Sequence, residues 1–137
     1  MVKSRSNLDQ FLQNLQDKIK AAYESSITIP EAEKLAGEFL HAQFVISKEL
    51  AIADLDARMR KQGVKAIKAA LYMEGATKVD KKPSDVLLNA QVDMSELTQS
   101  EQTSYDEAEV YAESLKTHLR ICSESHVYFR QLSRATG

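Results

Sequence analysis

The most constraining feature of this 137-residue chain is a regular pattern of mostly small or apolar residues near its C-terminus. Between positions 105 and 133, steps of three and four residues alternate without a break. The pattern comprises Tyr105, Ala108, Ala112, Leu115, Leu119, Cys122, His126, Phe129 and Ser133. Such a repeat indicates a long helix with a coiled-coil-like seam, and that seam must be covered by another helix.

A second long helix is predicted over residues 30–73. Thr28 is a suitable cap, Pro30 has the fixed φ of a first helical turn, and Glu31 completes a capping box. An apolar stripe then follows helical spacing, through Leu35, Phe39, Ala42, Ile46, Ala53 and Ala57. The same spacing continues beyond Gly63 to Leu71. Gly63 can either end the helix or lie inside it at a cost of roughly 1 kcal/mol, and the spacing favours continuation.

Shorter elements are expected on either side. Residues 1–26 hold an amphipathic helix over 7–22 and a linker, and residues 74–84 are expected to form a charged loop. Residues 85–137 hold a short helix and the long C-terminal helix, with a capping box at Thr98–Glu101. Periodicity alone leaves the short run after Ser84 open between helix and buried strand. Helix is favoured because nothing else in the chain supplies a sheet partner.

These elements predict an all-α fold in a single domain over residues 1–137. At ~1.5 Å per residue, residues 30–62 alone span roughly 50 Å and the C-terminal helix spans about as much. Each long helix has a core stripe with little else to bury against. A helical bundle with coiled-coil-like packing, completed by oligomerisation, satisfies both stripes.

Composition bounds the cellular setting. The lone Cys122 excludes an intrachain disulfide framework and is typical of a reducing compartment. No stretch approaches the ~18–20 consecutive apolar residues of a membrane span, and the N-terminus lacks the apolar region of a secretory signal. We therefore expect a cytoplasmic protein without a membrane partner.

Charge is distributed in blocks, although the net charge is only −2. Residues 57–82 carry eight basic and two acidic residues, whereas residues 83–115 carry no basic and eight acidic residues. Such blocks can set opposite charges against each other. They can also leave a basic patch on an acidic protein, which can then still bind nucleic acid.

The basic block contains a candidate nucleic-acid-binding surface. On a continuous helix, steps of three and four residues align four cations and one aromatic ring on one face. This basic stripe comprises Arg58, Lys61, Lys65, Lys68 and Tyr72, and the expected loop adds Lys78, Lys81 and Lys82. Cations in a row match a phosphate backbone, and an aromatic ring can stack on an unpaired base. The alternatives are a solvated face, or a surface that pairs with the acidic 85–113 segment.

An acidic run on the C-terminal helix is a weaker candidate for chemistry. Its members lie mostly away from the seam and have no His or Asn neighbours: Glu101, Asp106, Glu107, Glu109 and Glu113. Paired carboxylates can bind metals or transfer protons. In this setting a solvated face, or an electrostatic partner for the basic stripe, is favoured.

Two histidine patterns complete the candidates. His118, Cys122 and His126 have the i, i+4 spacing of helical metal ligands, but two of them fall on the seam. This placement favours a buried thiol and a hydrogen-bonded histidine. Arg120 and His126 have the loose spacing of HEPN-type ribonucleases, yet lie ~240° apart on a helix. The chain also has no Gly-rich phosphate loop, nucleophile elbow or paired CxxC. We therefore expect no enzymatic activity, no metal and no cofactor.

Two stretches carry a family resemblance. One is Lys65-Ala66-Ile67-Lys68-Ala69-Ala70-Leu71-Tyr72, and the other runs from Pro83-Ser84-Asp85 through Leu87-Leu88-Asn89-Ala90. The last helix adds Ser125 followed by the aromatic pair Tyr128-Phe129. Over residues 30–130 the chain resembles the UvsY-type recombination mediators of tailed phages. The family's Lys-Ala-Arg-Leu DNA-binding motif is matched at Lys68, Ala69 and Leu71, with Ala70 in place of the arginine.

The resemblance implies a small helical protein that forms ring-shaped homo-oligomers and binds single-stranded DNA. Such proteins help to load a RecA-like recombinase onto strands covered by single-strand-binding protein, so both proteins are implied partners. Lys68 is the one binding residue that the resemblance carries over. The leading functional hypothesis is accordingly a single-stranded-DNA-binding mediator of recombination and repair. The alternative is an oligomeric phage structural or assembly protein with no nucleic-acid role.

Overall fold

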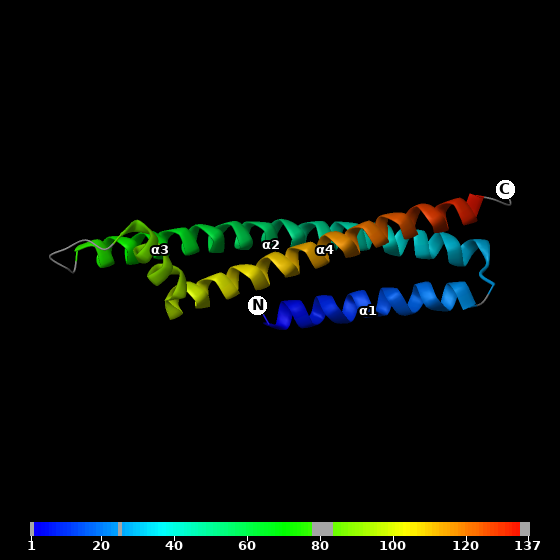
Figure 1. Ribbon diagram of the computed structural model, residues 1–137. Coiled ribbons are helices and arrows are strands. Elements are labelled where there is room, and N and C mark those ends of the chain that lie inside the picture. The colour runs from blue at the N-terminus through cyan, green and yellow to red at the C-terminus, as the bar shows by residue number, and fades with distance from the viewer. Residues whose placement is uncertain (1, 25, 78–83, 135–137) are drawn as a thin grey trace. The chain divides into compact units, whose positions relative to one another are not determined.

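The structure is a computed structural model that describes the backbone of residues 2–24, 26–77 and 84–134, with side chains from residue 7 onward. It contains four α-helices and no strand in these residues: α1 (Val2–Glu24), α2 (Ile29–Thr77), α3 (Asp85–Met94) and α4 (Glu96–Arg134) (Figure 1). The predicted all-α fold is confirmed. The helices divide into two compact units, residues 1–49 with 115–137, and residues 50–114.

The first unit is built from α1, the first part of α2 and the last part of α4. The α2 and α4 segments run antiparallel (Figure 1), and Phe39 stacks on Phe129 with ring centroids 5.6 Å apart. Lys18 of α1 forms an ion pair with Glu38 of α2 at 2.7 Å. The core of this unit consists of apolar residues from all three segments: Leu8, Leu12, Leu15, Ala32, Ala36, Phe39, Ala42, Ile46, Leu115, Cys122 and Phe129.

The second unit contains the rest of α2, α3 and the first part of α4. Small side chains form the seam between the two long helices, with Ala53 and Val64 on α2 and Ala108 and Ala112 on α4 all buried. Small residues let two helices approach closely. Leu88 and Val92 bury the inner face of α3. A single non-helical residue, Ser95, separates α3 from α4, and its N–H donates to the Val92 carbonyl.

The long helices agree with the sequence predictions in their main course. The α2 helix continues through Gly63, as expected, and the Glu31 N–H donates to Thr28 Oγ1 at 3.3 Å, which confirms the cap. The Ser84 hydroxyl caps α3 by accepting from the Leu87 N–H at 3.2 Å, so the short run is a helix and not a strand.

Three helix boundaries differ from the predictions. The α1 helix covers residues 2–24 instead of 7–22, because the polar segment before Leu8 continues the helix. The α2 helix extends beyond Met73 to Thr77, so the expected loop over 74–84 is shorter at its start. Thr77 Oγ1 donates to the Met73 carbonyl at 2.9 Å within this extra turn. The α4 helix begins at Glu96 because Ser95 provides the break, so Thr98 lies inside the helix and is buried.

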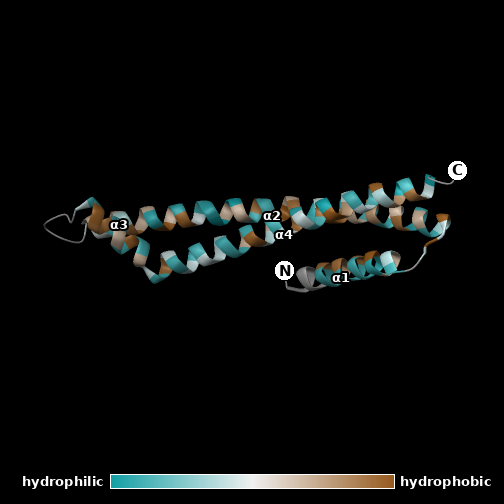
Figure 2. Cartoon of the chain, turned by 45° about the vertical axis from the view of Figure 1, so that its right-hand side comes forward, coloured by the Kyte–Doolittle hydropathy of each residue, from teal (hydrophilic) through white to brown (hydrophobic). Residues whose placement is uncertain are grey.

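The α2 helix is apolar on two faces within the second unit. Opposite the seam residues, the side chains of Ile52, Leu55 and Met59 are 55–65% exposed. Hydrophobic and hydrophilic residues therefore alternate along α2 without one clean polar side (Figure 2). None of the described helices combines the length and apolar character needed to cross a membrane.

Candidate nucleic-acid interface

The first three residues of the basic stripe lie on the second-unit part of α2. Arg58, Lys61 and Lys65 are all exposed. Residues three and four apart on a helix have Cβ atoms about 5–6 Å apart, so the three cations form one row. Among the described residues, none forms an ion pair with these three side chains. Their charge is therefore available to an anionic ligand.

The last two residues of the basic stripe contact α3. Lys68 Nζ lies 3.3 Å from Asp93 Oδ1, and the Tyr72 hydroxyl donates a hydrogen bond of 2.5 Å to Asp85 Oδ1. Both Lys68 and Tyr72 are half-buried. The structure thus divides the basic stripe into an exposed cationic row and an end that is occupied by protein carboxylates. Lys78, Lys81 and Lys82, which were expected in the loop, lie outside the described residues.

Arg60 is the one polar residue at a seam position of α2 near the basic stripe. This residue is half-buried, and its Nε lies 3.1–3.2 Å from both carboxylate oxygens of Asp56, one turn earlier. Gly63, in the same turn as Lys61 and Lys65, faces α4, and a Cβ placed on it would lie 3.7 Å from Glu101 Oε2. The stripe is consequently carried on an unbroken helix that is packed closely against α4.

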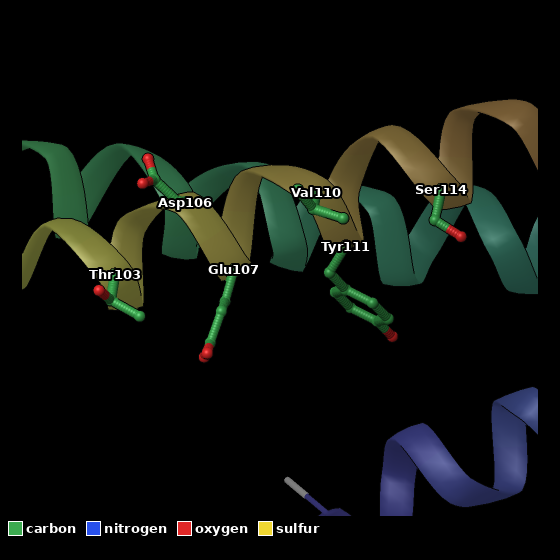
Figure 3. Close-up of a pocket in the computed structure, with 6 residues that line it drawn as sticks. All are labelled: Thr103, Asp106, Glu107, Val110, Tyr111 and Ser114. Atoms are coloured by element: carbon green, nitrogen blue, oxygen red, sulfur yellow. The ribbon is translucent and has the colours of Figure 1, made fainter.

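The acidic run on α4 forms a separate surface. Asp106 and Glu107 line a groove of about 500 Å³ together with four other α4 residues: Thr103, Val110, Tyr111 and Ser114 (Figure 3). A hydrogen bond to Glu109, with a smaller contribution from burial, raises the pKa of Tyr105 above its ordinary value. No ion pair joins these acidic residues to Arg58, Lys61 or Lys65 within the described part of the chain. The contact between acidic segment and basic stripe is made by α3.

The histidine and cysteine pattern lies in the first unit. Cys122 is buried, and desolvation raises the pKa of its thiol. His126 Nδ1 lies 2.8 Å from the Ala36 carbonyl oxygen, so this ring nitrogen carries a proton and donates it to the backbone. The expected buried thiol and hydrogen-bonded histidine are both confirmed. Among the described residues, no three His, Cys, Asp or Glu side chains are placed to hold a metal ion.

Residue spacing identified the basic stripe, but it missed the carboxylates of Asp85 and Asp93 at its end. Their signal was present only as the generally acidic character of the 85–113 segment.

Comparison of the chain with protein-family models, with curated proteins and with solved structures yields no match.

Proposed function

We propose that this protein binds single-stranded DNA through the basic stripe and acts as an accessory protein in recombination, by binding and not by catalysis. The observation that carries the proposal is the row of Arg58, Lys61 and Lys65, which are exposed and have no ion-pair partner among the described residues. Three aligned cations fit successive phosphates of a flexible strand. The resemblance to UvsY-type mediators supports single-stranded DNA as the ligand and a recombinase and single-strand-binding protein as partners.

Three phosphate contacts in one subunit give weak binding, so the proposal includes self-association. Several linked sites raise the effective concentration of each site for the same strand. Ile52, Leu55 and Met59 offer an apolar face for such an assembly, because each is more than half exposed. Contiguous exposed apolar side chains of this size are typical of protein–protein contacts. A ring-shaped homo-oligomer would present one stripe from each subunit.

Fluorescence anisotropy with a labelled oligo-dT strand tests the binding surface. The variant Arg58→Gln/Lys61→Gln/Lys65→Gln removes the exposed row. The matched control Lys20→Gln/Lys34→Gln/Lys48→Gln removes the same charge from exposed lysines of the first unit. We expect at least tenfold weaker binding for the first variant. We also expect its salt slope to be shallower by about 2, at about 0.7 per phosphate contact.

The controls separate a specific surface from general charge. A duplex of the same length should bind more weakly than the single strand. Equal losses in the two triple variants would show that net charge alone drives binding and would contradict the proposed surface. Absence of binding by the wild-type protein at low salt would remove the DNA hypothesis.

A structural or assembly protein is the second candidate function. The specific observation that favours it is the contact of Lys68 and Tyr72 with acidic residues of α3, because the basic stripe there already meets protein carboxylates. The exposed apolar face of α2 is compatible with both functions. A folded, oligomeric protein that binds no strand at low salt would establish this alternative over the first.

A further inference from the structure

The α3 helix carries two charged residues, and both contact the basic stripe. Asp93 Oδ1 lies 3.3 Å from Lys68 Nζ, and Asp85 Oδ1 accepts the hydrogen bond from the Tyr72 hydroxyl. No basic residue occurs in α3, whose sequence is DVLLNAQVDM. The helix therefore places a carboxylate against Lys68, the cation suited to a phosphate, and another against Tyr72, the aromatic residue suited to a base.

The packing of α3 against α2 is narrow. Leu88 and Val92 are its buried residues, while Val86 and Met94 are 82% and 76% exposed. A Cβ placed on Gly75 would lie 2.9 Å from Leu88 Cδ2, so the glycine permits this close approach. Beside the contact is a cavity of about 210 Å³, lined by Leu71, Glu74, Gly75, Leu88, Gln91, Val92 and Ser95.

These features make α3 a weakly held element. A ten-residue helix with two buried side chains has little apolar area to stabilise its position, and the adjacent cavity removes further contacts. The ion pair between Lys68 and Asp93 is also partly exposed, with side-chain accessibilities of 43% and 61%. Exposed ion pairs contribute little and are weakened by salt. Local opening of α3 therefore needs less free energy than unfolding of the unit.

We propose that α3 competes with the DNA strand for the end of the basic stripe. The helix must be displaced before Lys68 and Tyr72 can bind the DNA. Asp93 takes the position of a phosphate at Lys68, and Asp85 holds the phenol that would otherwise stack on a base. The row of Arg58, Lys61 and Lys65 captures the strand first, and displacement of α3 then extends the site. This inference rests on the proposed binding of single-stranded DNA and adds its regulation.

The variant Asp85→Asn/Asp93→Asn tests the competition in the full-length protein. Removal of both carboxylates should tighten binding of a labelled oligo-dT strand by about fivefold, the scale of an exposed ion pair near its upper limit. The salt slope should become steeper by about 0.7, because Lys68 gains one phosphate contact. The control Glu96→Gln/Glu107→Gln removes the same charge from exposed residues, neither of which forms an ion pair with the stripe in the described part of the chain. Glu96 also lies in a first helical turn, as Asp85 does.

The outcomes separate this inference from the proposed function. If the Asp85→Asn/Asp93→Asn variant binds more tightly and the control variant does not, the result supports both the DNA-binding proposal and the competition. Wild-type binding with equal changes in the two double variants leaves the DNA proposal intact and overturns the competition. Absence of binding in the wild type and in both double variants overturns both proposals.

Hydrogen exchange gives an independent measurement on the wild-type protein. Addition of oligo-dT should speed the exchange of α3 amides between Leu88 and Met94, because the strand displaces the helix. The amides of α2 around Lys61 should not exchange faster. Slower or unchanged exchange in α3, while anisotropy reports binding, would overturn the competition.

Discussion

The stacked pair of Phe39 and Phe129 supports a quantitative test of the first unit. Both rings are buried, with 0% and 1% exposure, and they lie nearly parallel at an interplanar angle of 5°. Replacement of Phe129 with alanine removes a complete aromatic side chain from this contact between α2 and α4. The resulting cavity cannot collapse fully, because the Phe39 ring and the helix backbones hold its walls.

The expected loss of stability is large. Truncation of a buried phenylalanine lowers the free energy of unfolding by about 3–5 kcal/mol. Domains of this size have total stabilities of about 5–15 kcal/mol, so Phe129→Ala should lose about a third to a half of a mid-range value. Phe129→Leu keeps much of the volume but loses the ring contact, which contributes about 0.5–1.5 kcal/mol beyond burial. The free energy of unfolding of Phe129→Leu should therefore lie between that of Phe129→Ala and that of the wild-type protein.

Urea unfolding followed by circular dichroism measures these differences, at two protein concentrations to reveal any contribution from self-association. Val127→Ala is the matched control, because Val127 is 49% exposed on the same helix. Its expected change is within about 0.5 kcal/mol. A loss below about 1 kcal/mol for Phe129→Ala, with an unchanged urea dependence, would refute the packing described for this unit.

Two further predictions concern buried polar groups. The Thr98 hydroxyl is buried and has no hydrogen-bond partner among the described residues. Thr98→Val should therefore raise the urea midpoint of unfolding by the equivalent of about 1 kcal/mol. A lowered midpoint would show that the hydroxyl has a hydrogen-bond partner in solution. Burial raises the pKa of the Cys122 thiol above its ordinary value of 9.0. The stability that the buried thiol contributes is therefore intact below pH 9. Above that pH the thiol ionises in the unfolded protein before it ionises in the folded protein, so the free energy of unfolding falls. Cys122→Ala should accordingly lose less stability than the wild type between pH 8 and pH 10, and equal losses in urea unfolding would contradict the buried, neutral thiol.

The regular helices could be predicted because their information is local and repeated. Steps of three and four residues placed Ala108, Ala112 and Leu115 on a seam, and all three are buried. The continuation of α2 through Gly63 follows from the same spacing. Boundaries were less accurate where no spacing signal exists, as at Thr77, because a polar helix end is decided by backbone hydrogen bonds and not by burial.

The end of the candidate site could not be predicted in the same way. The contacts of Asp85 and Asp93 with the basic stripe depend on where the ten-residue α3 helix packs on α2, where Leu88 lies close to Gly75. These contacts join residues 13 positions apart (Tyr72 and Asp85) and 25 positions apart (Lys68 and Asp93), and they leave no periodic trace. Sequence charge alone gave pairing of the acidic and basic blocks as one alternative, without indicating which residues or which helix would form the contacts.

The angular layout of α2 decides whether assembly and strand binding exclude each other. At about 100° per residue, the seam residues Ala53 and Val64 point about 140° away from the exposed apolar face of Ile52, Leu55 and Met59. The row of Arg58, Lys61 and Lys65 lies between them, about 100° from the seam and about 120° from that face. A second copy that covers only the apolar face would therefore leave the row accessible to solvent. Self-association through this face and binding of a strand along the row are compatible on one helix, and α3 competes only for the far end of the stripe.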